Sequence, residues 1–278
     1  MEFNLDDILI QQNTIEDQRK TLNRVVNYFK SQSYHDEVMN TLAKERGLSR
    51  QIVDEHDVFF IDEDTTVDSL PDYIDETTGI VNWTYVTFAG RIVYPVKDVM
   101  GDVMGFCGWD KFDDVKYLDS KNYGYNAKRN ILFGMERLKE YYASQKPVFL
   151  VEGIVDTMIL RDNGFQALAS LGSSLGSYQR TILSRFGSRL IAITDNDNIA
   201  GDRGVETAGN AYALSILRKL PKSLVFQTTS EKDIDDVIRL GVGYKNNLLE
   251  DLRELELYNF ILGPRELRQR TALFKRGY

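Results

Sequence analysis

Apolar residues at the start of the chain recur at helical spacing. Leu22, Val25, Val26 and Phe29 follow this spacing, and a second periodic stretch runs from Val38 to a stop at Gly47. Such periodicity is typical of amphipathic helices, so residues 1–53 are predicted to be helical. Residues 54–80 are acidic and show no regular period, and an irregular segment is expected there.

The pattern becomes short and β-rich between residues 83 and 109. Three apolar runs, WTYVTF, RIVYPV and DVMGFCGW, are separated by turn residues such as Asp98 to Asp102. Runs of this length with aromatic and β-branched residues indicate strands, and the short turns favour antiparallel neighbours. An antiparallel meander is therefore predicted.

From residue 147 onward, apolar runs alternate with stretches of helical period. The runs are VFLVEG, ALASLG, LIAITD and LVFQT. Strands that alternate with helices predict βαβ units and a parallel sheet that is buried on both faces. The expected fold class is α/β: a parallel sheet flanked by helices, preceded by a mixed α+β basic subdomain and followed by a short helical tail.

Four segments follow from these patterns. They are a helical and acidic N-terminal segment at 1–80, a mixed α+β subdomain at 81–146, the parallel-sheet domain at 147–242, and a C-terminal helical segment with a basic tail at 243–278. The formal net charge is −8, but residues 91–150 carry 10 basic and 8 acidic side chains and residues 263–278 carry 5 and 1. A polyanion is therefore expected to bind in the middle or at the tail.

Composition narrows the class of protein further. No run of eighteen apolar residues occurs and the first residues are acidic and polar, which predicts a cytoplasmic protein without a membrane partner. One cysteine and two histidines cannot supply the four ligands of a structural zinc site, so no zinc is expected within this chain.

Acidic residues follow three of the four predicted parallel strands. Glu152 closes the first strand, and Asp195 closes the third. The full set of predicted metal-binding residues is Glu152, Asp156, Asp195, Asp197, Asp233 and Asp235. In such sheets the ligand site forms at the carboxyl ends of the strands, so these carboxylates are expected to converge.

Clustered carboxylates repel one another unless cations neutralise them. Oxygen ligands without Cys or His favour Mg²⁺ or Mn²⁺, and two or more such ions would suit phosphoryl or nucleotidyl transfer. A single Asp at a strand end is more often a helix cap than a ligand. The ordered combination after several strands favours a site.

These residues resemble a known fold family. Glu152-Gly153 with Asp156, then ALASLGSS, then Asp195-Asn-Asp197 with Ala200-Gly201 look like the TOPRIM fold. The preceding stretches RIVYPVKDVMGDVMGFCGW, KYLDS and NAKRNILFGM resemble the basic subdomain of DnaG-type primases, and LAKERGLSRQIVDEHDVFF resembles their helical lead-in. The resemblance spans roughly residues 35–240.

The resemblance implies a DNA primase, a DNA-directed RNA polymerase and nucleotidyltransferase that makes RNA primers from nucleoside triphosphates on single-stranded DNA. It implies catalytic roles for Glu152, Asp195 and Asp197. The basic residues that it assigns to nucleotide or DNA binding are Arg91, Lys116, Lys128 and Arg129. The stretch DNDNIAG is one residue longer than the usual family motif, and the family's zinc-ribbon module is absent from this chain. A replicative helicase or a separate zinc-ribbon protein is therefore an expected partner.

Two alternatives remain open from the sequence. One is a TOPRIM-type nuclease, which would use the same metals to hydrolyse nucleic acid. The other is a non-catalytic adaptor, derived from a primase, that binds a replicative helicase. The short architecture suggests a bacteriophage replication protein acting in the cytoplasm of a bacterial host.

Overall fold

The computed structural model describes residues 5–65, 88–110, 117–120, 130–195, 208–227, 231 and 233–256. The chain forms two compact units. Unit 1 contains residues 1–44 and 50–128, and unit 2 contains residues 45–49 and 129–278. The finer division at residues 80, 146 and 242 stays a prediction.

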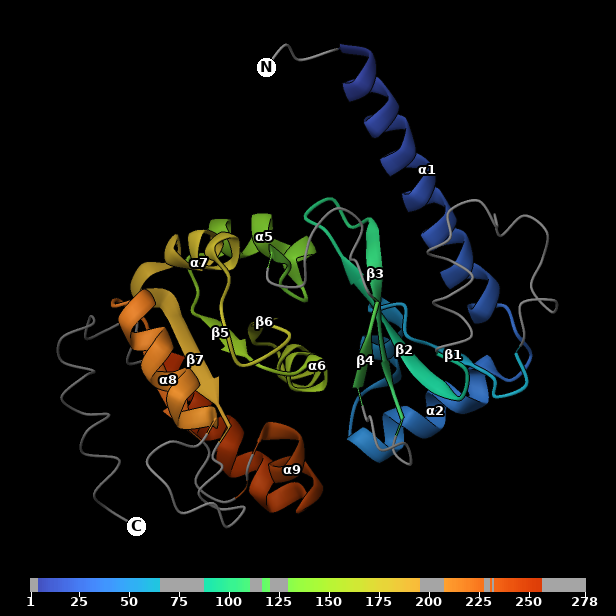
Figure 1. The fold of residues 1–278 in the computed structure, drawn as a ribbon. Helices are drawn as coiled ribbons and strands as arrows, with labels where there is room; N and C mark the ends of the chain where they lie inside the picture. The colour runs from blue at the N-terminus through green and yellow to red at the C-terminus, as the bar shows by residue number, and fades with distance from the viewer. Residues whose placement is uncertain are drawn as a thin grey trace. The chain divides into compact units, whose positions relative to one another are not determined.

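Unit 1 begins with helices. They are α1 (Leu5–Lys30) and α2 (His35–Arg46), which Figure 1 labels, and α3 (Arg50–Glu55). The last two residues of α2 already belong to unit 2. Helix α2 stops before Gly47, whose φ of 62° lies in the left-handed region that glycine adopts without strain. The predicted helical start is confirmed.

An antiparallel sheet follows in the same unit. Its strands are β1 (Phe59–Ile61), β2 (Arg91–Lys97), β3 (Val103–Trp109) and β4 (Tyr117–Asp119), in that order across the sheet. The runs RIVYPV and DVMGFCGW are thus confirmed as antiparallel neighbours, whereas residues 83–87 of WTYVTF lie outside the described residues. The expectation of an irregular segment from residue 54 is wrong for its start, because α3 continues to Glu55 and β1 pairs with β2.

The core of unit 1 forms between α1 and this sheet. Leu22, Val25 and Phe29 on one face of α1 are buried against strand residues. Phe29 stacks on Phe59 with ring centroids 5.5 Å apart, and Phe59 meets Phe106 edge to face at the same distance. The apolar residues of α1 therefore recur at the spacing that places them on one face of the helix, and this face packs against the sheet.

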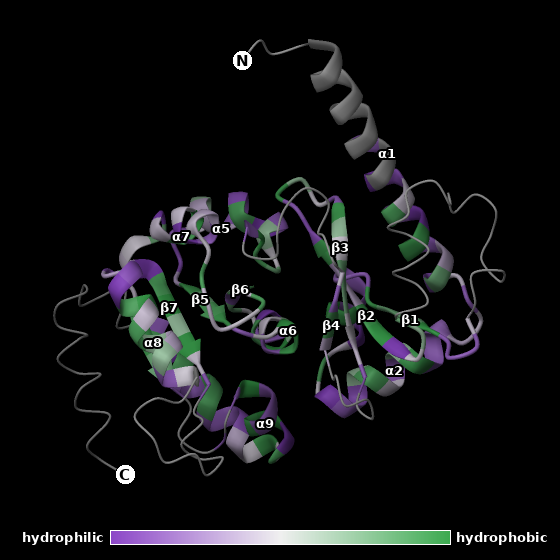
Figure 2. Cartoon of the chain, viewed as in Figure 1, coloured by the Kyte–Doolittle hydropathy of each residue, from purple (hydrophilic) through white to green (hydrophobic). Residues whose placement is uncertain are grey.

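Unit 2 contains a parallel sheet. Its strands are β5 (Val148–Val151), β6 (Gln166–Ala169), β7 (Leu190–Thr194) and β8 (Leu224–Gln227), and their order is β6-β5-β7-β8. All three pairings are parallel. Every residue of β5, β6 and β7 is buried, which explains why these strands are continuous apolar runs rather than alternating ones. Figure 2 shows the apolar colouring of β5 and β7.

Helices flank this sheet. They are η4 (Met135–Arg137), α5 (Leu138–Ser144), α6 (Ile154–Asp162), α7 (Ser177–Ser184), η5 (Gly187–Arg189), α8 (Ala208–Lys219) and α9 (Ile234–Arg239), and residues 242–256 are also helical. The predicted α/β fold with a parallel sheet is confirmed. No helix in the described part of the chain has both the length and the apolar character needed to cross a membrane.

Candidate active site at the carboxyl ends of the parallel strands

Two of the predicted acids stand directly after neighbouring strands. Glu152 follows the last residue of β5, and Asp195 follows the last residue of β7. Strands β5 and β7 are parallel neighbours, so both acids lie at the same edge of the sheet. Strand β8 borders β7, and Asp233 and Asp235 come after it in the chain.

Asp156 occupies the first turn of α6, and its pKa depends on acids that follow the other strands in the chain. Burial raises the pKa of Asp156 well above its ordinary value, and the negative charges of Asp233, Asp195 and Asp235 raise that pKa further. This effect requires the carboxylates to lie near one another. The amide of Asp235 also bonds directly to Asp156, so α6 and α9 meet here; the roles of these acids stay a prediction.

Asp233 caps a helix and also lies among the acidic residues at this edge. Its carboxylate caps the N-terminus of α9 by accepting a hydrogen bond of 2.8 Å from the amide of Asp236. Burial raises the pKa of Asp233 to about 6; the bond from that amide opposes the rise, and the charges of Asp236, Asp195 and Asp235 add to it. The helix-cap interpretation of a single acid therefore holds for Asp233, alongside its place in the cluster.

Asp235 is held from several sides. Its amide donates a hydrogen bond of 3.1 Å to Oδ1 of Asp156. Its Oδ2 forms ion pairs with Arg46 and with Arg239. Its other oxygen, Oδ1, is buried and has no hydrogen-bond partner in the described structure. An unpaired buried carboxylate oxygen is costly, which marks it as a position suited to a ligand.

Gly153 stands between the end of β5 and the start of α6. Its φ of −99° is one that any residue adopts, so the backbone does not require glycine. A Cβ at this position would lie 2.7 Å from Oδ2 of Asp156, which is closer than such atoms approach. The glycine therefore leaves room for the Asp156 carboxylate.

Glu152 lies near a buried hydroxyl pair. The hydroxyl of Tyr212 in α8 donates a hydrogen bond of 2.7 Å to Oγ of Ser170, the residue after β6. Burial raises the pKa of Tyr212, the bond to Ser170 opposes this, and the negative charge of Glu152 adds to the rise. Ser170 Oγ in turn donates to the carbonyl of Gly172 at 2.7 Å.

The donor set at this edge fits a hard divalent cation. The side chains of its described members offer oxygen atoms only, burial and the neighbouring negative charges raise the pKa of Asp156 and of Asp233, and the buried Oδ1 of Asp235 has no hydrogen-bond partner in the described structure. Among the described residues, no three acidic, histidine or cysteine side chains lie close enough to enclose an ion. Asp197, a predicted ligand, lies outside those residues.

The predicted nucleotide-binding residues belong to the region before the parallel sheet. Arg91 is in β2 and is only 4% exposed. Its Cδ lies 3.1 Å from where a Cβ on Gly108 would be, so it packs inside unit 1 beside β3. Lys116, Lys128 and Arg129 lie outside the described residues. Their roles stay predictions.

Arg46 was not found by sequence reasoning. It pairs with Asp235 from 189 positions away, and its side chain is 4% exposed. No spacing rule connects residues that far apart. The one local signal is its place in the last turn of α2, where basic residues are common.

Comparison with known proteins identifies both parts of the chain. Residues 12–139 match the family described as "DNA primase catalytic core, N-terminal domain", and residues 149–238 match the family described as "Toprim-like". A DNA primase of Listeria monocytogenes is 32% identical over 155 residues, which are 55% of this chain and 24% of that protein. A DNA primase of Listeria innocua is 28% identical over 214 residues, or 72% of this chain and 34% of that protein.

The fold is also found among solved structures. The structure of a DnaG primase catalytic domain bound to single-stranded DNA matches with a TM-score of 0.66 at 21% identity, over 87% of this chain and 82% of that one. The present chain spans a quarter to a third of the length of the two Listeria relatives. The chain thus joins a match to the N-terminal domain of the DNA primase catalytic core to a match to a Toprim-like domain, and these relatives are DNA primases.

Proposed function

We propose that this chain synthesises short RNA primers from nucleoside triphosphates on a single-stranded DNA template. The observation that carries this proposal is the convergence of Asp156, Asp195, Asp233 and Asp235 at one sheet edge, in a chain whose preceding domain is that of a primase catalytic core. The related catalytic domain that was solved with single-stranded DNA supports the choice of template.

The reaction is an in-line displacement at a phosphorus atom. The 3′-hydroxyl of the growing primer gives up its proton as its oxygen attacks the α-phosphate of the incoming triphosphate; a new P–O bond forms, and the bond to pyrophosphate breaks. Mg²⁺ or Mn²⁺, two or more ions when bound, would supply activation of the hydroxyl and stabilisation of the leaving pyrophosphate. Glu152, Asp195 and Asp197 are the residues nearest this chemistry in the proposal, and Asp156, Asp233 and Asp235 complete the ligand set.

The basic residues would hold the anionic substrates. Lys116 and Lys128, with Arg91 and Arg129 as helpers, would pair with phosphates of the triphosphate or the template. The chain's net charge of −8 gives little general attraction to DNA, so binding depends on such local groups. A replicative helicase or a separate zinc-ribbon protein would raise the effective concentration of the template.

The test is incubation with labelled ribonucleotides, Mg²⁺ or Mn²⁺, and single-stranded DNA of mixed sequence. Short RNA products from the wild type, and none from Asp195→Asn or Asp197→Asn, would support the proposal. Shortening of the DNA without RNA synthesis would instead identify a nuclease. Neither product, with helicase binding retained, would identify an adaptor.

A further inference from the structure

Residues 45–49 belong to unit 2, although the chain on both sides of them belongs to unit 1. Two residues anchor this short segment. Arg46 forms an ion pair with Asp235, and Ser49 donates to both oxygens of Asp162, from its amide to Oδ2 at 2.7 Å and from its hydroxyl to Oδ1. Between them Leu48 is buried, with 9% of its surface exposed. The segment is therefore part of the parallel-sheet unit.

The Arg46 side chain reaches the acidic edge of the sheet through this segment. Its side chain is 4% exposed and that of Asp235 is 13% exposed. A buried guanidinium needs a charged partner, because transfer from water without one is costly. The ion pair with Asp235 thus fixes where both groups lie.

The two oxygens of Asp235 have different surroundings. Oδ2 accepts from Arg46 and from Arg239, whose side chain is 48% exposed. Oδ1 is buried without a hydrogen-bond partner in the described structure. Because the arginines take the same oxygen, the other oxygen is directed elsewhere. The backbone bond from Asp235 to Asp156 ties this carboxylate to the acidic cluster.

We propose that Arg46 is a positioning residue, which fixes Asp235 through Oδ2 so that Oδ1 is presented to a divalent cation. This inference rests on the proposed function, since it takes the acidic edge as the metal site. A segment from the helical start of the chain would then complete the site of the parallel-sheet unit. Partners that hydrogen-bond a metal-binding carboxylate act in this way in other proteins, and their loss weakens metal affinity about 10- to 100-fold.

The test measures Mn²⁺ affinity of the full chain by the electron paramagnetic resonance signal of free Mn²⁺. Arg46→Gln should weaken binding by about 10- to 100-fold. Arg46→Lys should restore part of the affinity, because an ammonium can still pair with Oδ2. Arg239→Gln should have a smaller effect, since Arg239 is much more exposed. Tighter binding by Arg46→Gln would overturn the proposal, because it would mean that Arg46 only screens the negative charge.

A double-mutant cycle separates positioning from direct binding. If Arg46 acts through Asp235, Arg46→Gln should cost little further affinity in an Asp235→Asn background. An equal loss in both backgrounds would overturn the proposal. Ser49→Ala is the matched control: it removes the hydroxyl bond from Ser49 to Asp162, keeps the amide bond, and should leave Mn²⁺ affinity near that of the wild type. A loss equal to that of Arg46→Gln would assign the effect to docking of the segment and reject the role of the side chain.

The binding assay needs neither template nor nucleotides. If no RNA is made but the predicted pattern of Mn²⁺ affinities is found, primer synthesis is rejected and the role of Arg46 stands. Thermal unfolding of each variant, followed by circular dichroism, shows whether it is folded at the assay temperature. Should Arg46→Gln fail this check, Arg46→Lys takes its place in the cycle: its smaller loss of Mn²⁺ affinity should disappear in the Asp235→Asn background, and an equal loss in both backgrounds would overturn the proposal.

Discussion

The amide of Asp235 donates a hydrogen bond of 3.1 Å to Oδ1 of Asp156, although the two residues are 79 positions apart. The bond joins the first turn of α6 to the first turn of α9. A carboxylate that is fixed by a backbone donor has less freedom to rotate, so its orientation is set before any substrate binds. The acidic edge is thus held together by the backbone as well as by side chains.

Gly153→Ala should disrupt this arrangement without straining the backbone. The new Cβ would lie 2.7 Å from Oδ2 of Asp156, so the carboxylate must move. Displacement of a reacting or positioning group by about 1 Å can cost on the order of 100-fold in rate, and a loss of primer synthesis of that order is expected. Initial rates on saturating template measure it.

The matched control for this change is Gly243→Ala. Gly243 is in a helix, and a Cβ there meets nothing within 4 Å. The alanine should leave synthesis unchanged and favour the helix slightly. Equal rates for Gly153→Ala and the wild type would show that the position of the Asp156 carboxylate does not matter to the reaction.

Asp156→Asn should stabilise the protein when no divalent cation is bound. Burial raises the pKa of Asp156 and the negative charges of the neighbouring acids raise it further, so the folded state opposes its charged form when no metal is bound. An amide keeps an oxygen that can accept the bond from Asp235 but removes the repulsion. The melting temperature in EDTA should rise by about 2–4 °C for each kcal/mol of relief.

The same melting experiment is repeated with Mg²⁺ in place of EDTA. The wild type should gain stability from Mg²⁺ because the cation binds the folded state, and the variant should gain less. A variant that melts below the wild type in EDTA, or that gains as much from Mg²⁺, would contradict the placement of Asp156 among the repelling acids.

The sequence predicted the strands of unit 2 because buried parallel strands are uninterrupted apolar runs, as β5 and β7 are. It also predicted that Glu152 and Asp195 share an edge, since they follow the parallel neighbours β5 and β7, while the roles of the six acids stay a prediction. It missed β1, which has three residues and lies beside acidic ones. The role of Arg46 was not predicted either, because its contact with Asp235 depends on tertiary packing between residues 189 positions apart.

Lys116→Ala and Lys128→Ala should each weaken binding of single-stranded DNA or of triphosphate. If each lysine contacts one phosphate of the strand, its loss lowers the slope of log affinity against log salt by about 0.7. Fluorescence anisotropy over a range of salt concentrations measures this slope. Lys219→Ala, which changes an exposed residue in the last turn of α8, serves as the control. An unchanged slope and unchanged triphosphate affinity would assign both lysines to the solvated surface.

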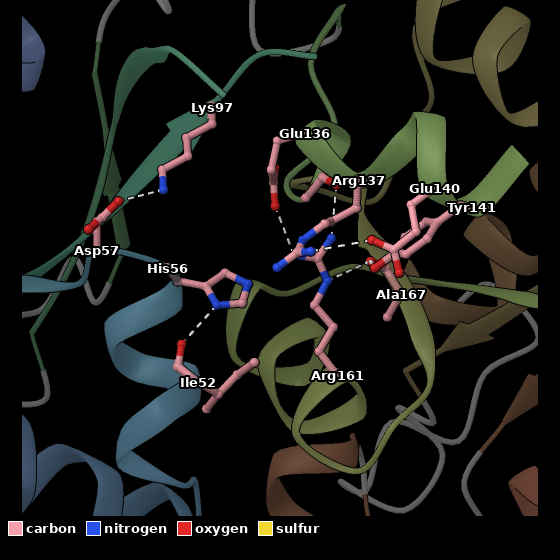
Figure 3. A network of polar contacts seen from close by, with 11 residues as sticks. Ile52, His56, Asp57, Lys97, Glu136, Arg137, Glu140, Tyr141, Arg161 and Ala167 are labelled. Atoms are coloured by element: carbon pink, nitrogen blue, oxygen red, sulfur yellow. Dashed lines mark hydrogen bonds and ion pairs between the residues drawn. The ribbon is translucent and has the colours of Figure 1, made fainter. Parts of the chain in front are cut away.

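Arg161→Gln should destabilise unit 2 strongly. Arg161 forms an ion pair of 2.9 Å with Glu136 and donates to the carbonyls of Gly134 and Ala167 (Figure 3). Its side chain is only 7% exposed. Removing one partner of a buried pair costs about 3–5 kcal/mol, because the other is left without compensation.

Arg137→Gln is the control for Arg161→Gln. Arg137 pairs with Glu140 at 3.3 Å, and both side chains are about half exposed. Exposed pairs contribute roughly 0–1 kcal/mol. Urea unfolding measures both free energies of unfolding, and equal effects would show that the burial of Arg161 does not govern its contribution.

His35 should make unit 1 less stable as the pH falls below neutrality. Burial lowers the pKa of His35; the positive charges of Arg50 and Lys30 lower it further, and Asp36 and Asp54 oppose them. The folded state therefore prefers the neutral ring. The contribution of neutral His35 to stability is fully present above the unfolded-state pKa of about 6.5. It is lost as the pH falls toward the lower folded-state pKa.

The measurement is the free energy of unfolding of the wild type and of His35→Gln between pH 7.5 and pH 5. Glutamine cannot take up a proton, so the variant should lose less stability than the wild type over this range, and the difference between the two curves should grow as the pH falls below the unfolded-state pKa of about 6.5. Titration of Asp57 does not contribute to the stability change between pH 7.5 and pH 5. Burial would raise its pKa, but hydrogen bonds from Lys30 and Lys97 hold that pKa below the ordinary value, so its contribution is lost only at more acid pH. Parallel curves for the two proteins would show that His35 takes up its proton equally well in the folded and unfolded states.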